Sequence, residues 1–104
     1  MYIWDIEELK FQIGKLFRFY RLSKKLSQLQ LGNEINLSGN QIGRIERAET
    51  NPTIESLIKF CNFFNLDILF IFSKLTENEI NKIDIEIERL EKEFKNHNKR
   101  KTNK

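Results

Sequence analysis

The feature that most constrains how this chain can fold is the stretch 26–46, which predicts two short helices around a tight bend. Ser27 can accept a hydrogen bond from a backbone N–H of the first helical turn. Leu31 and Ile35 stand four residues apart, so both fall on one face of a helix. Asn36 follows, and asparagine is one of the few residues that tolerate the left-handed backbone at the end of a helix. The first helix should therefore stop at Asn36.

A second short helix is predicted directly after the bend. Leu37 supplies an apolar side chain in the bend, and Ser38 can cap the helix that follows. Ile42 and Ile45 would point inward. The polar side chains would point outward: Asn40, Gln41 and Arg44. This pattern is typical of a helix-turn-helix, whose second helix can enter the major groove of DNA.

The region around this stretch resembles the lambda-repressor-like, Xre-type helix-turn-helix regulators. The resemblance covers roughly residues 13–72 and rests on several motifs in the family's order. These motifs are Arg21, Ser27-Gln28, Leu31, Leu37-Ser38, Ile42, Arg44-Ile45-Glu46, and Asn51-Pro52-Thr53 with the apolar periodicity after it. The resemblance implies an all-α fold: a five-helix DNA-binding bundle, here with an extended first helix and an additional C-terminal amphipathic helix.

The resemblance also implies roles for individual side chains. In the family, an arginine at the position of Arg21 pairs with the glutamate that ends the recognition helix, here Glu46, and can present its edge to a phosphate. A glutamine at the position of Gln28 bridges a phosphate and the recognition helix. Asn40 and Gln41 lie where family members reach the bases, and their amides can offer adenine a donor and an acceptor together. The expected DNA-contacting residues are Arg21, Gln28, Ser38, Gly39, Asn40, Gln41, Arg44, Arg47 and Asn51.

Four residues depart from the family pattern, among them Leu29, where the family usually has a polar residue. Gly39 and Gly43 lie within the second helix of the motif, where glycine costs roughly 0.5–1 kcal/mol relative to alanine. Close approach of the backbone to DNA would explain them, and so would sequence drift on an exposed face. Ala48 stands where glycine is common at the end of that helix. We therefore expect an exit other than a left-handed C-cap there.

The helix-turn-helix domain is expected to cover residues 13–73. Residues 1–12 would extend the first helix, with Asp5 as its N-cap. Pro52 and Thr53 predict the start of a fourth helix. The period of the apolar run 66–72 is ambiguous. The family implies a short fifth helix there, beginning at Asp67, and an edge strand paired across a dimer is the alternative.

Residues 76–95 predict a separate amphipathic helix. Thr76 and Glu79 have the spacing of a capping box. The apolar residues that follow alternate steps of three and four, as in a coiled-coil seam: Ile80, Ile83, Ile87, Leu90 and Phe94. A helix of this length is marginal alone, so the seam either pairs with a second copy or folds back on the bundle. We expect it to dimerise, and we expect the basic tail 96–104 to be disordered.

Charge distribution says more about partners than the net charge of +3 does. Residues 13–50 carry seven basic and three acidic side chains, whereas residues 76–94 carry three basic and seven acidic ones. Cys61 and His97 are the only cysteine and histidine, so an intramolecular disulfide or a paired-thiolate metal site is excluded. We expect no enzyme activity, no metal and no cofactor, because the sequence has no metal-ligand cluster and no glycine-rich phosphate loop. The sequence shows no signal peptide and no apolar span of membrane length, so we expect a cytoplasmic location.

These observations predict a bacterial, sequence-specific DNA-binding transcriptional regulator. The simplest form is a repressor that binds a palindromic operator as a homodimer. The alternative is the antitoxin of a toxin–antitoxin pair, which would bind a toxin and also regulate itself through DNA. An interaction module that had lost DNA binding should carry apolar or acidic residues on the outer face of the second helix, and this chain carries polar ones there.

Overall fold

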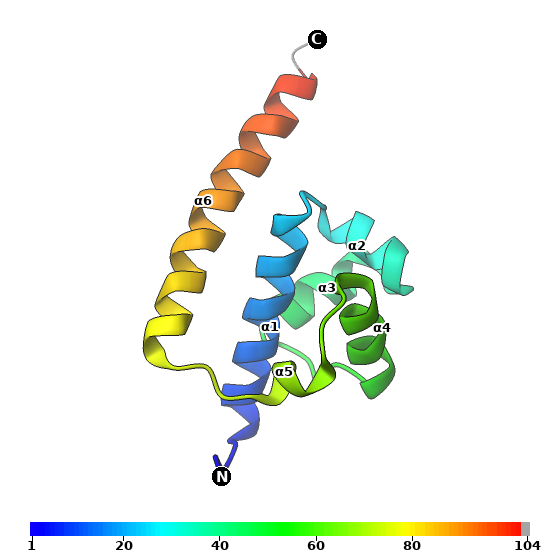
Figure 1. The fold of residues 1–104 in the computed structure, drawn as a ribbon. Coiled ribbons are helices and arrows are strands. Elements are labelled where there is room, and N and C mark those ends of the chain that lie inside the picture. The colour runs from blue at the N-terminus through cyan, green and yellow to red at the C-terminus, as the bar shows by residue number, and fades with distance from the viewer. Residues whose placement is uncertain (103–104) are drawn as a thin grey trace.

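The computed structural model describes residues 1–102, with side chains through Asn98, and over this range it contains helices and no strand (Figure 1). The helices are α1 (Ile6–Ser23), α2 (Gln28–Ile35), α3 (Gly39–Glu46), α4 (Ile54–Phe64), α5 (Ile68–Phe72) and α6 (Glu77–Thr102). α1 is central, with α2, α3 and α4 on one side and α6 along the other (Figure 1). None of these helices is both long and apolar enough to cross a membrane. The all-α fold class is confirmed.

The helices begin and end at the residues that the sequence marks. Asp5 accepts hydrogen bonds from the backbone N–H of Glu7 at 3.1 Å and of Glu8 at 3.3 Å. α2 stops at Asn36, whose φ of 60° is left-handed. The other predicted N-caps are also in place: Ser27, Ser38, Thr53 and Thr76. Each cap satisfies backbone N–H groups that have no partner inside the helix, so local sequence sets the helix limits.

The apolar run after Asp67 forms helix α5, and the edge-strand alternative is wrong. Asp67 caps the helix by accepting a hydrogen bond from a backbone N–H at 2.9 Å. On the exit side, the buried side chain of Gln12 donates to the carbonyl oxygens of Ile71 at 3.0 Å and Ser73 at 2.9 Å. Its own Oε1 accepts from the N–H of Leu75 at 3.1 Å. Backbone groups that a strand would pair across a dimer are therefore bonded to α1.

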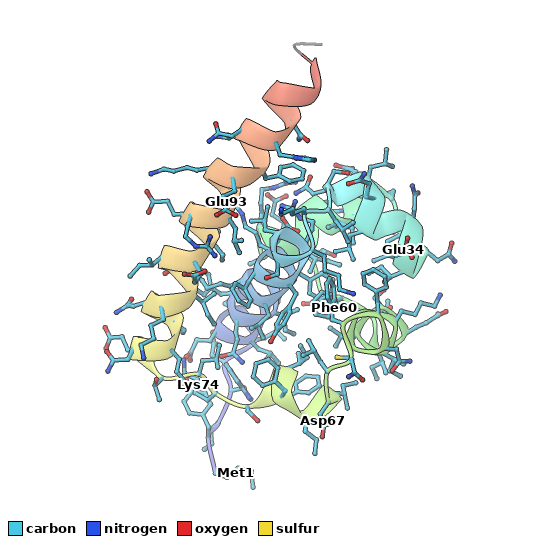
Figure 2. The ribbon with its side chains drawn as sticks, turned by 45° about the horizontal axis from the view of Figure 1, so that its top comes forward. Met1, Glu34, Phe60, Asp67, Lys74 and Glu93 are labelled. Atoms are coloured by element: carbon cyan, nitrogen blue, oxygen red, sulfur yellow. The ribbon has the colours of Figure 1, made fainter. Side chains whose placement is uncertain are left out.

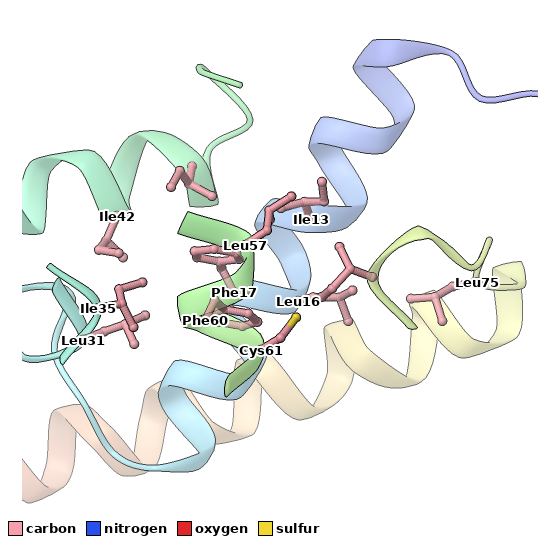
Figure 3. Close-up of a cluster of buried hydrophobic side chains, with 12 residues drawn as sticks. Ile13, Leu16, Phe17, Leu31, Ile35, Ile42, Leu57, Phe60, Cys61 and Leu75 are labelled. Atoms are coloured by element: carbon pink, nitrogen blue, oxygen red, sulfur yellow. The ribbon is translucent and has the colours of Figure 1, made fainter. Parts of the chain in front are cut away.

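The hydrophobic core centres on two stacked aromatic rings. Phe17 of α1 and Phe60 of α4 are fully buried, with ring centroids 3.9 Å apart and planes 5° from parallel. Apolar side chains from the other helices surround this pair (Figure 3): Ile13, Leu16, Leu31, Ile35, Ile42, Ile45, Leu57, Cys61, Ile71 and Leu75. The core therefore holds α2 and α3 against α1 and α4, and Cys61 belongs to it as a small buried side chain.

α1 and α3 approach each other closely at Gly14. A Cβ on Gly14 would lie 2.5 Å from the carbonyl oxygen of Ile45 and 2.8 Å from that of Glu46. Both obstacles are backbone atoms, which cannot turn aside as a flexible side chain can. Glycine at this position therefore lets the last turn of α3 lie directly against α1.

The N-terminal extension packs over one end of the bundle through its aromatic residues. Trp4 Nε1 donates to the carbonyl oxygen of Phe72 at 3.0 Å. Tyr2 meets Trp4 edge to face, with ring centroids 4.9 Å apart. The first five residues thus connect the start of α1 to the end of α5.

α6 folds back along α1 of the same chain, so the seam that we expected to dimerise is occupied within one molecule (Figures 1 and 2). Lys15 of α1 pairs with Asp84, and Nη2 of Arg18 lies 2.7 Å from Oε2 of Glu91. Ile87 is 8% exposed, and the other seam residues are half-buried: Ile80, Ile83, Leu90 and Phe94. The extended α1 supplies both an apolar surface and matching charges, and a seam of two heptads gains these without a partner chain.

α6 also extends further than predicted. The tail expected to be disordered begins at residue 96, yet the helix continues through Thr102. No glycine or proline follows Thr76 to stop it. Residues 103–104 of that tail lie outside the described residues.

Substitutions at two neighbouring isoleucines test the folded-back position of α6. Ile87→Ala should lower the free energy of unfolding by about 2–3 kcal/mol, because it removes buried methyl groups. Ile85→Ala is the matched control: this side chain is 66% exposed, and its loss should change the free energy of unfolding by less than about 0.5 kcal/mol. Urea unfolding followed by circular dichroism measures both. Equal effects of the two substitutions, or a midpoint that rises with protein concentration, would contradict the intramolecular packing.

Candidate nucleic-acid interface

The two faces of α3 differ sharply in polarity and exposure. Ile42 is fully buried and Ile45 is 3% exposed, and both pack into the core. Asn40, Gln41 and Arg44 are exposed on the other face. Such an amphipathic helix packs against the core through its apolar face and exposes its polar face to solvent.

α6 lies beside α3 at the C-terminal end of α3. There Arg47 and Ala48 border a shallow depression with Asp84 and Ile87. The first turn of α3 is at the opposite end of that helix, so its exposed amides are not covered by α6. The side chains expected to read bases are therefore accessible in this arrangement.

Gln41 has a structural bond in addition to its exposed position. Its Oε1 accepts from the backbone N–H of Ser38 at 2.8 Å, while Oγ of Ser38 accepts from the backbone N–H of Gln41 at 3.0 Å. This reciprocal capping box holds Gln41 in the first turn of α3. The Ser38-x-x-Gln41 spacing is the sequence signal of such a box.

Arg21 and Glu46 form the ion pair that the family resemblance implies. Nε of Arg21 donates to Oε2 of Glu46 at 2.7 Å, and Nη2 donates to Oε1 at 3.1 Å. Nη1 donates to the carbonyl oxygen of Leu26 at 2.8 Å. Nε2 of Gln28 donates to Oε1 of the same Glu46 carboxylate at 3.2 Å. One carboxylate thus joins the end of α1, the start of α2 and the end of α3.

This network leaves Arg21 little capacity for the phosphate contact that the family resemblance implies. The Arg21 side chain is 8% exposed and that of Glu46 is 3% exposed. Each of the three guanidinium nitrogens already donates a hydrogen bond within the chain. Little of the guanidinium surface is left for DNA, so we assign Arg21 to the ion pair alone.

Contacts within the chain account for the two glycines of α3. A Cβ on Gly39 would lie 3.2 Å from the Cα of Leu29 in α2. A Cβ on the buried Gly43 would lie 2.9 Å from Nη1 of Arg47 and 3.2 Å from Oε1 of Gln28. Gly39 therefore allows close packing of α2 and α3, and Gly43 leaves room for two polar side chains beside the helix. Both glycines thus have a role inside the chain, while close approach of the backbone to DNA stays a prediction.

The backbone conformation at the C-terminal end of α3 also differs from the expectation. Ala48 has a left-handed φ of 59°, and its N–H donates to the carbonyl oxygen of Ile45 at 3.0 Å. The N–H of Glu49 donates to the carbonyl oxygen of Arg44 at 2.9 Å. These two bonds are those of a Schellman motif, so the expectation of another kind of exit is wrong. Alanine adopts the left-handed conformation at a cost of about 1–2 kcal/mol, which the surrounding bonds and packing offset.

Two other expected contact residues flank the exposed face of α3. Arg47 is engaged by Glu49, with Nε lying 2.7 Å from Oε2, and this hydrogen bond raises the pKa of Arg47 and lowers that of Glu49. A phosphate at Arg47 would have to compete with the Glu49 carboxylate. This pairing was not predicted from the sequence. Asn51 is exposed and shares with Gln41 and Arg44 the lining of a depression of about 260 Å³.

Comparison with protein families gives one match over this region. Residues 17–71, more than half of the chain, match the family described as helix-turn-helix. The matched span takes in the C-terminal part of α1, all of α2, α3 and α4, and nearly all of α5, whereas α6 lies beyond it. Searches of curated proteins and of solved structures found no match.

The two arginine–glutamate pairs of this region allow a matched test of burial. Both have a closest N–O distance of 2.7 Å, but one pair is buried and the other is about half exposed. Glu46→Ala should lower the free energy of unfolding by about 3–5 kcal/mol, because the Arg21 charge stays buried without a partner. Glu49→Ala should leave the free energy of unfolding almost unchanged, since water solvates Arg47. Chemical denaturation of both variants measures the contrast, and similar losses would show that the buried network does not hold α3.

Proposed function

The chain belongs to the lambda-repressor-like, Xre-type helix-turn-helix family of DNA-binding transcription regulators, and from that membership we propose that it represses transcription at a specific operator. Repression needs no more than occupancy, because a bound protein excludes polymerase from the same DNA. Acting on DNA in this way fits a cytoplasmic location in a bacterium.

The observation that carries this proposal is the exposed polar face of α3. Asn40 is exposed, and its side chain makes no hydrogen bond within the described part of the chain. Gln41 is held at the same turn by its cap. Amide side chains pair with adenine through two hydrogen bonds, and arginine pairs similarly with guanine, each such pair giving about 1–3 kcal/mol of discrimination. We assign base reading to Asn40, Gln41 and Arg44.

Phosphate contacts would surround this face and set the register of the protein on DNA. We assign them to side chains at the edges of α3 and to the backbone at its start: Gln28, Ser38, Gly39, Arg47 and Asn51. Gly39 is the first residue of α3, where backbone N–H groups face outward along the helix axis. Affinity would fall steeply with salt, because neutralised phosphates release their counterions.

We also propose that two copies bind together, since helix-turn-helix dimers read half-sites about one helical turn apart on DNA. The inward face of α6 is occupied by α1, so a second copy would have to meet another surface. Exposed apolar side chains are present on α4, where Ile54 is 74% exposed and Ile58, one turn later, is 44% exposed. α4 follows the loop that leaves α3, so pairing there would keep the two recognition helices close together.

Binding-site selection from a random duplex pool tests specificity, symmetry and spacing together. The purified full-length chain should enrich a single motif, arranged as two inverted half-sites about one helical turn apart. Enrichment of a single half-site without symmetry would overturn the homodimer proposal. No enrichment over the starting pool, at low and moderate salt, would overturn sequence-specific binding itself.

Substitutions at the first turn of α3 should separate base reading from folding. On the selected duplex, Asn40→Ala should weaken binding by about tenfold or more, with little change in thermal unfolding, because its side chain supports nothing in the chain. Gln41→Glu keeps the capping-box acceptor and removes the amide donor. It should therefore also weaken binding while the melting temperature is retained. Asn33→Ala, an exposed amide on α2, is the control and should bind as the unsubstituted chain does. Unchanged operator affinity for both α3 variants would rule out their base-reading roles.

No observation in residues 1–98 favours the antitoxin role over that of a free-standing regulator. Both would use the same α3 face, and an antitoxin would need a second surface for its toxin. We therefore advance the regulator alone. A protein partner encoded beside this chain and purified with it would be the finding that favours the antitoxin.

A further inference from the structure

The C-terminal half of α6 brings the basic side chain of Lys95 to the start of α2. Glu91, Phe94 and Lys95 line one shallow depression together with Ser27 and Gln28. α6 runs on past the ends of α1 and α2 that meet there (Figure 1). The family match ends before α6 begins, so nothing in that match assigns a role to this end of the helix.

This depression adjoins the recognition helix through Gln28. The Gln28 side chain donates to Glu46 at the end of α3 and lies against Gly43. Lys95 therefore lies beside Gln28, the residue of α2 that contacts α3. A second depression, next along α6, places Lys25 against Glu93, Asn96 and His97.

The carboxylates near these lysines are already paired with arginines. Glu91 is bound by Arg18 at 2.7 Å, and Glu93 is bound by Arg89 at 2.5 Å. Among residues 1–98, Lys25 and Lys95 have no carboxylate within 4.0 Å, and both are exposed. Glu91 and Glu93 are thus neutralised by arginines of the same chain. Within that range, the unpaired charges at this end of α6 are those of Lys25 and Lys95, and both are positive.

The backbone at Lys25 sets the position of this side chain. Lys25 has a left-handed φ of 58°, and its N–H donates to the carbonyl oxygen of Leu22 at 2.9 Å. The N–H of Leu26 completes a Schellman motif with the carbonyl oxygen of Arg21 at 3.1 Å. Glycine would fill this position without the cost of about 1–2 kcal/mol that a side chain brings. The turn at Lys25 has the same form as the one at Ala48, and it places Lys25 beside the C-terminal half of α6.

From these contacts we propose that Lys25 and Lys95 form a second contact with the DNA backbone, on phosphates that flank the bases read by α3. The proposal rests on the proposed function, because it takes α3 to lie in the major groove. α6 is then a rigid arm: its first half is fastened to α1, and its basic end reaches DNA beyond the start of α2. The sequence supports the same direction, since residues 95–104 carry five basic residues and no acidic one.

Salt dependence measures such contacts directly. Each phosphate neutralised on B-DNA adds about 0.9 to the magnitude of the slope of log K against log salt. The double variant Lys25→Gln/Lys95→Gln should therefore lower that slope by about 1.8 on the selected operator with flanking base pairs, and weaken binding equally on unrelated sequences. Lys82→Gln, the same change at an exposed position in the first half of α6, should leave the slope unchanged. On a duplex trimmed to the bases read by α3, the double variant and the unsubstituted chain should give the same slope.

The outcomes separate this proposal from the proposed function. A slope of the double variant equal to that of the unsubstituted chain on the flanked operator would overturn the second contact and leave the regulator standing. An equal decrease in the salt slope for Lys82→Gln would also overturn the second contact, because the decrease would then reflect net charge alone. If the unsubstituted chain prefers no duplex sequence, both proposals fall together. Circular dichroism of the double variant checks that α6 remains folded. The single variant Lys95→Gln should lower the salt slope by half as much as the double variant does.

Discussion

The structure depends most on the buried ion pair between Arg21 and Glu46. Its members are 8% and 3% exposed, and Gln28 and the carbonyl oxygen of Leu26 complete the hydrogen bonds around them. A buried ion pair contributes little net stability by itself, because desolvating two charges offsets their attraction. Its effect here is on geometry: α1, α2 and α3 can place their polar groups around this carboxylate in one arrangement. The angle at which α3 leaves the bundle, and hence the aim of Asn40, follows from that arrangement.

The same side chains that hold the fold also prepare the interface. Gln41 is bonded back to Ser38, and Gln28 is bonded to Glu46, so both amides are fixed before any DNA arrives. Ordering a side chain on binding costs about 0.5–1.5 kcal/mol, and preorganised groups avoid much of that cost. Gly39 and Gly43 contribute by bringing α2 and its Gln28 close to the recognition helix. The recognition surface is therefore a consequence of how α2 and α3 pack, more than of α3 alone.

α6 shows how one amphipathic helix can divide its charges between two tasks. Asp84 and Glu91 face Lys15 and Arg18 of α1, which fastens the first part of the helix beside the core. Lys95, in the second half of α6, has no ion pair among residues 1–98, and the helix continues beyond the bundle. Asp84 and Glu91 would neutralise the charges of Lys15 and Arg18 on α1. The C-terminal end of α6 would remain available to an anion. A net charge of +3 hides this division, and the positions of the charges show it.

Sequence alone determined the parts of this protein that depend on neighbours along the chain. The caps at Asp5, Ser27, Ser38 and Thr53, and the inward stripe of α3, follow from spacings of a few residues, so the helices and the outward position of Asn40 could be read directly. Tertiary structure decided what depends on distant residues meeting. The seam of α6 is compatible with a second copy or with α1, and only the matching surface of α1 settled which one it covers. The left-handed exit at Ala48 runs against that residue's own preference and is imposed by packing. The family resemblance implied the pairing of Arg21 with Glu46, but only the structure shows that the pair is buried.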